Sequence, residues 1–330
     1  MNWQGSRLAG VVFENINRND IIIHTLKIRE YIMLIHEIVE YCNTEYRNTD
    51  TTHLCGNCNH PSACPGSCKS CLKQIHFPLK CPDGKKDYDC ENMINFYICD
   101  YTNKYASEML YLLRKSEKLK EINEYHILSI GCGAAPDLMA FEKYAYDADS
   151  NKDIRYFGVD VNSLWQPIHN KIMNYSSGYI NSIKFVYDDA IKYFNKISIP
   201  NTNVIVLQYV ISHFYNTGQI KQIKQFFVNL VKKVVKKKSN DEPLIILIND
   251  VNSCYRGRNF FEDFTKILSV YKHNGYFWKF YFDYRIQNDS QRYGEKHQKN
   301  NTLFNLDDID LDIYDPWKEC SSAQMLIEID

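Results

Sequence analysis

The sequence predicts an α/β protein with a doubly wound, seven-stranded, mostly parallel sheet whose last pair of strands is antiparallel. Three observations support this fold class. From residue 126 onward, short apolar runs alternate with amphipathic segments, which is the pattern of βαβ units. The first run leads directly into the turn Gly131-x-Gly133. The last two runs, 276–285 and 323–329, have no convincing helix between them. A helical region and a Cys-rich, zinc-binding region precede the sheet.

The N-terminal third divides into three segments. Residues 18–48 are expected to be helical, because apolar residues recur at helical spacing with charges between them. Residues 51–90 combine cysteines with turn residues and few apolar ones. A second helical stretch, from 89 to about 122, carries an aromatic stripe that we expect to serve packing rather than substrate binding. The expected domains are therefore an N-terminal helical segment (1–50), a Cys-rich zinc-binding module (51–90), connecting helices (91–122) and the α/β domain (123–330).

The elements of the α/β domain follow from hydrophobic periodicity. Strands are expected at 126–130, 155–160, 182–187, 203–209 and 243–250, and helices at 137–146, 165–174, 189–195 and 219–237. Alternation of this kind predicts a parallel sheet with both faces covered. The strands 276–285 and 323–329 are expected to pair antiparallel at the sheet edge, with the acidic stretch 307–312 as a surface loop between them.

Composition limits the classes of partner. The chain has 330 residues, 45% of them hydrophobic, so it can bury a substantial core. Its 39 basic and 40 acidic residues give no overall positive charge that would indicate nucleic-acid binding. The basic run 232–238 is expected to end a helix, where cations suit the helix dipole. No N-terminal signal-like core is present and no run approaches the roughly 20 apolar residues of a membrane span, so we expect a cytoplasmic protein with no membrane partner.

Nine of the 12 cysteines lie between residues 42 and 99. In a reducing compartment such a cluster indicates a metal site more than disulfides. Cys55-x2-Cys58 and Cys68-x2-Cys71 are two short hooks, and together they can supply the four thiolates of a structural zinc site. With few apolar residues for a core, this segment is expected to need its metal to fold.

Other cysteines and histidines in this region could also bind metal, so the number of ions is one or two. Cys64, His76, Cys81 and Cys90 are sufficient for a second zinc site, with His60 and Cys99 as substitutes. The spacing Cys64-x3-Cys68-x2-Cys71 also fits the iron–sulfur triad of radical enzymes. Those enzymes are built on a barrel of βα repeats, which this sequence lacks, so zinc is favoured.

Three turns at successive strand ends point to a nucleotide-like cofactor. Gly131 and Gly133 have no Cβ, so the backbone can turn sharply and a ligand can lie against it. Asp160 ends the next strand, 29 residues beyond Gly131, where a carboxylate can accept both hydroxyls of a ribose. Asp188 and Asp189 end the third strand, although Asp189 is also a good helix N-cap.

This ordering resembles the class I, Rossmann-like S-adenosylmethionine-dependent methyltransferases over residues 120–330. The resemblance implies that Gly131 and Gly133 face the methionine part of S-adenosyl-L-methionine and that Asp160 faces the ribose. Asp188 or Asp189 with Ala190 would face the adenine edge, and Asp137 would reach the methionine amino group. The full expected cofactor set is Gly131, Gly133, Ala135, Asp137, Asp160, Val161, Asp188, Asp189, Ala190 and Gln208.

The sequence departs from the family pattern at three places. Ser129 stands where an acidic residue is usual, two positions before the first glycine, and Ala135 stands at a frequent third glycine. The fourth strand lacks the Asp/Asn-Pro-Pro-aromatic turn of enzymes that methylate exocyclic base nitrogens or glutamine amides. Because a sulfonium is an activated donor, catalysis requires mainly positioning and proton removal. The catalytic residues stay unassigned, with Tyr209, His213, Asp250 and Asn252 as candidates near the donor methyl.

Two functions fit the sequence. The first is an S-adenosylmethionine-dependent methyltransferase whose acceptor is a macromolecule, RNA or protein, contacted by the zinc module. The second is a catalytically weak or inactive binding protein of the same fold, which acts through its zinc module in a larger assembly. Ser129 and Ala135 favour the second hypothesis.

Overall fold

The structure is a computed structural model that describes residues 32–49, 67–78, 80–81, 83–148, 152–194, 199–237, 242–270, 275–283 and 292–330. The chain divides into two units, Met1–Ile32 and Met33–Asp330. All helices and strands with assigned bounds lie in the second unit. None of the described helices combines the length and apolar character needed to cross a bilayer.

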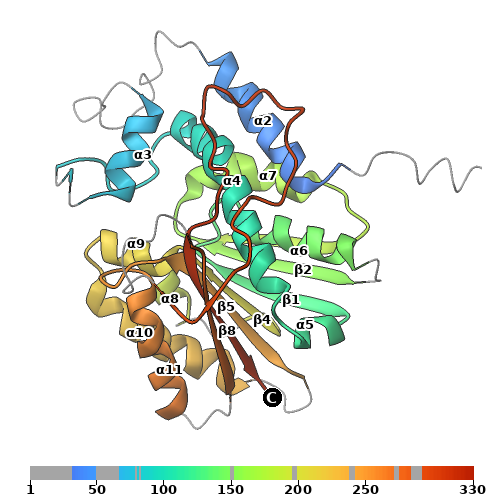
Figure 1. Ribbon diagram of the computed structural model, residues 1–330, viewed down its shortest axis with the longest axis vertical. Helices are drawn as coiled ribbons and strands as arrows, with labels where there is room; N and C mark the ends of the chain where they lie inside the picture. Colours follow the sequence, from blue (N-terminus) through green and yellow to red (C-terminus); the bar gives the residue numbers. More distant parts are fainter. Residues whose placement is uncertain are drawn as a thin grey trace, which may run out of the picture. The chain divides into compact units, whose positions relative to one another are not determined.

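An eight-stranded sheet forms the centre of the second unit, with strand order β3-β2-β1-β4-β5-β8-β6-β7 (Figure 1). Strands β1 to β5 are parallel, and β8 is antiparallel to both of its neighbours. The strands are β1 Glu124–Ile130, β2 Asp153–Asp160, β3 Ile180–Tyr187, β4 Val204–Gln208, β5 Leu244–Val251, β6 Gly275–Tyr281, β7 Glu295–Lys296 and β8 Ser322–Ile329.

The α/β class, the parallel sheet and the antiparallel last pair are confirmed, but two details differ. The sheet has eight strands rather than seven, because the two-residue strand β7 pairs with the end of β6. Strand β8 does not lie at the edge. It pairs with β5 from Leu244 to Val251 on one side and with β6 on the other, and all eight of its residues are buried.

Side chains alternate between the two faces of the sheet, and each face has its own hydrophobic core. Ile127, Leu247 and Leu326 belong to the core that also contains residues of α2, α4, α6 and α7. Leu128, Ile246 and Met325 are the neighbouring positions in the same three strands, and they belong to the core that contains residues of α8 to α11. The sequence period of two therefore places helices on both faces, as Figure 1 shows.

Ten helices are assigned in the described residues. The predicted helices all have counterparts, although residues 18–31 lie outside the described part of the chain. Three helices were not predicted, namely α3, α9 and α11. The helices are α2 Leu34–Asn48, α3 Cys68–His76, α4 Glu91–Leu113, α5 Lys118–Glu121, α6 Pro136–Asp147, α7 Gln166–Asn174, α8 Ala190–Tyr193, α9 Val210–Asn216, α10 Ile220–Lys233 and α11 Phe261–Val270.

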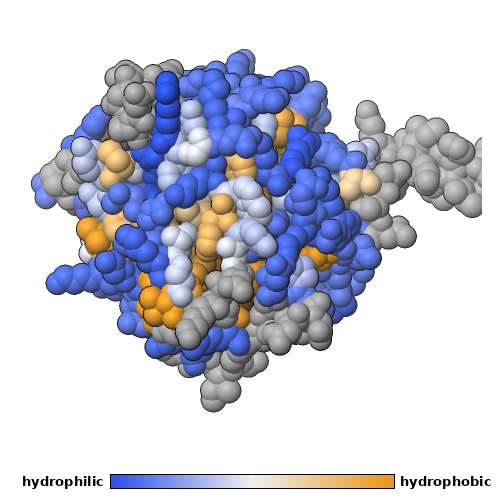
Figure 2. Space-filling view, turned by 60° about the horizontal axis from the view of Figure 1, so that its bottom comes forward, coloured by the Kyte–Doolittle hydropathy of each residue, from blue (hydrophilic) through white to orange (hydrophobic). Residues whose placement is uncertain are grey.

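The acidic stretch 307–312 lies in the long connection between β7 and β8, as predicted. This connection passes over α2 and α4 (Figure 1). Asp308 accepts a hydrogen bond of 2.5 Å from His36, and Asp310 forms an ion pair of 2.9 Å with Arg47. With the lower end of Figure 1 turned forward, the surface is mostly hydrophilic, and hydrophobic side chains show through in a few places (Figure 2).

Candidate functional site

A cavity of about 580 Å³ lies at the carboxyl ends of β1, β2, β3 and β4. This is the edge of a doubly wound sheet at which ligands bind. The structure brings eight of the ten expected cofactor residues to its lining: Gly131, Gly133, Asp160, Val161, Asp188, Asp189, Ala190 and Gln208. Its volume falls within the range of small-molecule sites.

The glycine turn is held in a conformation that favours glycine. Gly131 and Gly133 have φ of 64° and 49°, in the left-handed region. A Cβ on Gly131 would lie 2.6 Å from Cγ2 of Val210. Behind the turn, Nε2 of His169 donates to the Gly133 carbonyl at 2.7 Å, so Nδ1 is the acceptor for the Tyr187 hydroxyl at 2.9 Å. Burial lowers the pKa of His169 to about 4, so the ring is neutral at pH 7.

Asp160 connects the turn after β2 to the glycine turn. One carboxylate oxygen accepts from the Gly133 backbone N–H at 2.8 Å, and the other accepts from that of Asn162 at 2.9 Å. Burial raises the pKa of Asp160 to about 6 despite these bonds, which favour the ionised form. At pH 7 a carboxylate therefore borders the cavity.

The residues after β3 have different local roles. Oδ1 of Asp189 accepts from the backbone N–H groups of Ile191 and Lys192, both at 2.9 Å, so Asp189 is the N-cap of α8. Capping engages Oδ1 of Asp189, and the carboxylates of Asp188 and Asp189 both border the cavity.

Two expected residues lie outside this lining. Ala135 is fully buried and is the N-cap of α6, with φ of 54°. Asp137 is 1% exposed and accepts from the Tyr156 hydroxyl at 3.0 Å. It borders a second cavity of about 40 Å³, together with Ser129. The two cavities share the lining residues Tyr97, Tyr105, Gly131, Gly133, Gln208 and Tyr209.

Gln208 presents a buried acceptor at the end of β4. Its amide nitrogen donates to the Tyr105 carbonyl at 2.8 Å, while its Oε1 is buried without a hydrogen-bond partner. A buried acceptor without a partner costs free energy. A ligand N–H group in the cavity would satisfy it.

Helix α4 supplies an aromatic wall to the cavity from the stripe that the sequence analysis identified. Tyr97, Tyr101 and Tyr105, spaced four residues apart, all line the large cavity. The Tyr97 and Tyr101 rings stack at 5.3 Å, and Tyr105 lies 4.3 Å from the Tyr209 ring. These three residues of the aromatic stripe, which we expected to serve packing, pack on one another and also line the cavity. Their i, i+4, i+8 spacing was the available signal.

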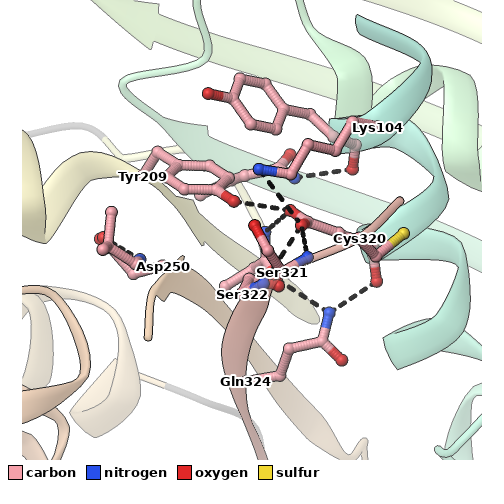
Figure 3. A network of polar contacts seen from close by, with 12 residues as sticks. Lys104, Tyr209, Asp250, Cys320, Ser321, Ser322 and Gln324 are labelled. Carbon is pink, nitrogen blue, oxygen red and sulfur yellow. Dashed lines mark hydrogen bonds and ion pairs between the residues drawn. The ribbon is translucent and has the colours of Figure 1, made fainter. Parts of the chain in front are cut away.

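A buried carboxylate lies behind this wall, where α4, the β4–α9 turn and β8 meet (Figure 3). Glu108 is fully buried and accepts hydrogen bonds from the Tyr209 hydroxyl at 2.7 Å and from the Ser321 backbone N–H at 2.8 Å. Lys104 forms an ion pair with it at 3.7 Å. The Lys104 ammonium also lies 4.6 Å from the Trp317 ring centroid, and both residues border the cavity.

The catalytic candidates separate by location. Tyr209, His213 and Asn252 line the cavity, whereas Asp250 is fully buried and does not. The Asp250 carboxylate accepts from the backbone N–H groups of Ile211 at 3.0 Å and Ser212 at 3.1 Å. It therefore holds the start of α9, and we no longer regard it as a catalytic candidate.

The expected metal ligands are only partly described. Cys55, Cys58 and Cys64 lie outside the described residues. Cys68 and Cys71 are buried in α3, Cys81 is half-buried and Cys90 precedes α4. Within the described ranges, no group of three or more His, Cys, Asp or Glu side chains is placed to hold a metal ion.

His76, expected as a metal ligand, faces the cavity instead. Its two ring nitrogens form hydrogen bonds with the hydroxyls of Tyr88 at 3.0 Å and Tyr101 at 3.3 Å. Both ring nitrogens are thus engaged by phenols, which leaves neither for a metal in this arrangement.

Comparison with known proteins identifies relatives only among solved structures. No family model matches the sequence, and no curated protein matches it either. The chain is similar to a SAM-dependent methyltransferase from Archaeoglobus fulgidus, with 16% identity and a TM-score of 0.36 over 68% of this chain and 94% of that one. It is similar to the plantazolicin methyltransferase BpumL, solved with SAH, at 14% identity and a TM-score of 0.42 over 79% and 95%.

A third similar structure is a putative class I S-adenosylmethionine-dependent methyltransferase from Listeria monocytogenes, at 13% identity and a TM-score of 0.38 over 94% and 84%. All three structural neighbours are methyltransferases. Since their identities and TM-scores are low, the fold assignment depends on the sheet order of this chain.

Proposed function

We propose that this chain is an S-adenosylmethionine-dependent methyltransferase. The observation that carries the proposal is the convergence of three strand-end turns on one cavity: the glycine turn after β1, Asp160 after β2 and Asp188 after β3. These turns are separated in the sequence and meet only because β1, β2 and β3 are adjacent and parallel.

The chemistry of the lining residues fits this cofactor. In the proposed arrangement Asp160 accepts from the ribose hydroxyls and Asp188 from the adenine amino group. The methionine part lies toward the small cavity, where Asp137 faces the ammonium. The Oε1 atom of Gln208, buried without a partner, accepts from a ligand N–H group. When bound, the sulfonium supplies an activated methyl group.

The proton acceptor in this proposal is His213. It lines the cavity, and burial lowers its pKa, so its imidazole is neutral at pH 7 and can accept a proton. Tyr209 is less suited to this role. Burial and the charge of Glu108 raise its pKa well above the usual value, so it stays protonated and donates a hydrogen bond to Glu108.

Calorimetric titration with S-adenosylmethionine and S-adenosylhomocysteine tests the proposal. Asp160→Asn removes the proposed ribose acceptor, and Asp153→Asn at the exposed start of the same strand is the matched control. We expect Asp160→Asn to weaken binding at least about tenfold, because a hydrogen bond to a charged group is lost, and Asp153→Asn to leave it unchanged. Absence of heat with either ligand would reject the methyltransferase.

We further propose that the Cys-rich module binds one or two zinc ions through a set drawn from Cys55, Cys58, Cys64, Cys68, Cys71, Cys81 and Cys90, and that it contacts a macromolecular acceptor, RNA or protein. A reducing, cytoplasmic setting belongs to this proposal, because it keeps the thiols available. The position of α3 supports it: Ile75, His76 and Phe77 lie four to six residues after Cys71, in α3 and its C-cap, and all three line the cavity.

Elemental analysis of the purified chain tests this second part. We expect about one or two zinc ions per chain, and loss of metal in Cys55→Ser and Cys68→Ser. Cys320→Ser is the control, since Cys320 lies beside Glu108, outside the module. Iron in place of zinc, or an undiminished zinc content in both module variants, would contradict the module.

The alternative, a binding protein of this fold with little or no catalysis, is favoured by Asp137. Its carboxylate is nearly fully buried and is bonded to Tyr156, and Ser129 supplies no charge in its place. The same titration decides between the two functions. Binding of both ligands supports the methyltransferase, and failure of both supports the binding protein.

A further inference from the structure

Arg256 is a cation in the cavity wall whose contacts are all neutral. Its Nη1 donates to the His76 carbonyl at 3.0 Å and to Oδ1 of Asn216 at 3.3 Å. The guanidinium carbon lies 5.8 Å from the Phe77 ring centroid. No carboxylate among the described residues forms an ion pair with it. A half-buried cation with no counter-charge favours the binding of an anion.

The loop between β5 and α11 fixes the position of this cation. Asn252 and Gly257 form an antiparallel bridge across it. Gly257 has φ of 64°, and a Cβ there would lie 2.6 Å from the Val251 carbonyl oxygen. Only glycine fits this close approach. The loop is therefore tightly closed, and the backbone at Arg256 is held in a defined position.

The other charged groups around this part of the cavity do not balance Arg256. Burial lowers the pKa of the neighbouring His76 to about 4, and the positive charges of Lys104 and Arg256 lower it further. The charge of Lys104 is compensated by Glu108. Burial lowers the pKa of His213 and raises that of Asp160, and the negative charge of the nearby Asp87 raises both. Among the cavity-lining residues that the structure describes, Arg256 is thus the cation without a carboxylate partner.

Aromatic rings continue from this cation along the wall. The His76 ring lies 5.0 Å from that of Tyr101, and Tyr101 lies 5.3 Å from Tyr97 and 5.5 Å from Tyr105. Burial raises the pKa of each of these tyrosines, so their phenols are neutral at pH 7. Neutral rings of this kind stack against planar groups.

We infer that the methyl acceptor presents to this cavity a planar ring that carries an anionic group, with the ring against Tyr97 and Tyr101 and the anion on Arg256. The role of this ligand as acceptor rests on the proposed function, whereas its binding does not. A carboxylate and a phosphate monoester share the required chemistry.

Two pairs of probes that differ in charge test the inference. Benzoate and benzamide have the same ring, and so have adenosine monophosphate and adenosine. Each is titrated calorimetrically, with S-adenosylhomocysteine present in excess to block the proposed adenosyl site. We expect the wild type to bind the anionic member of a pair at least about tenfold more tightly. The pair with the larger ratio indicates whether the anion is a carboxylate or a phosphate.

Variants assign the discrimination to one residue. Arg256→Gln is expected to remove the preference for the anionic probe, and Arg256→Lys to keep part of it, since the charge remains but the two-pronged geometry is lost. Arg155→Gln is the control, because Arg155 lies on β2 outside the cavity lining. Unchanged binding of S-adenosylhomocysteine to Arg256→Gln would show that its fold is intact.

Three results would overturn the inference: equal affinity within both pairs, an undiminished preference in Arg256→Gln, or no binding of any probe at millimolar concentration. The proposed function is judged separately. If S-adenosylhomocysteine does not bind, the methyltransferase fails, while the ratio for benzoate and benzamide still decides whether the ring-and-anion site exists.

Discussion

The hydroxyl of Tyr209 donates a hydrogen bond of 2.7 Å to Glu108, a fully buried carboxylate 101 residues earlier in the chain. This bond joins the turn after β4 to helix α4, and the ion pair of Glu108 with Lys104 lies on the same helix. The carboxylate thus links two parts of the cavity wall, the helix that carries Tyr105 and the turn that carries Tyr209, whose rings are in contact.

Glu108→Gln is expected to lower the free energy of unfolding by about 3–5 kcal/mol, because it leaves the buried Lys104 ammonium without its counter-charge. Lys104→Met in the same background is expected to recover part of this loss. Urea unfolding of the two single variants and the double variant measures the coupling. Glu117→Gln, in the exposed pair with Lys120, is the control and should cost at most about 1 kcal/mol. Additive effects of Lys104→Met and Glu108→Gln would contradict the pairing.

Gly131→Ala is expected to destabilise the fold by about 1–3 kcal/mol and to abolish binding of S-adenosylhomocysteine. It forces a side chain into positive φ and against Val210. Gly178→Ala is the matched control, since a Cβ there meets nothing within 4 Å. Adding Val210→Ala to Gly131→Ala relieves the contact but not the backbone strain, so only part of the stability should return. If Gly131→Ala binds the ligand normally, the glycine turn is not part of the cofactor site.

Binding of S-adenosylhomocysteine is expected to weaken as the pH falls through about 6. The pKa of Asp160 is raised by burial to about 6, so below that pH the carboxyl takes up a proton and loses an acceptor for the ribose. The loss should be at most about tenfold per pH unit, as for a single proton. Calorimetry between pH 8 and pH 5 in wild type and Asp160→Asn measures it, and a profile that stays pH-dependent in the variant would assign the effect elsewhere.

His169→Ala is expected to weaken ligand binding by about tenfold or less and to cost about 1–3 kcal/mol of stability, because the half-buried Gly133 carbonyl loses its donor. His169→Gln keeps an N–H donor and should lose less. Tyr187→Phe removes only the bond on the far side of the ring and serves as the control. Equal losses in His169→Ala and Tyr187→Phe would mean that the ring acts only by packing on Phe185.

The sheet was predictable because its signals are local. The alternation of apolar residues located seven of the strands, and the three acidic or glycine turns meet because parallel strands end at one edge. Helix α11 also had a local signal that was missed, since Phe261, Phe264 and Leu268 recur at helical spacing and are buried.

Helix α9 could not be found in this way. The predicted strand ends at residue 209, and the apolar run continues through Val210 and Ile211 without a local sign of a helix. The break arises because Tyr209 adopts φ of 58° and Asp250, from β5, caps the new helix. A cap supplied by a distant strand leaves no local trace. Arg256 and Trp317 were missed for the same reason, since both reach the cavity from remote loops.

The position of β8 between β5 and β6 has a consequence for synthesis on the ribosome. This strand follows all the others in the chain, yet it supplies the middle of that half of the sheet. Until it emerges, β5 and β6 have no partner on the edges that β8 will occupy. The nascent protein then exposes two unpaired strand edges, which can pair with other chains. Chaperone protection of this intermediate would be most valuable until β8 has left the ribosome.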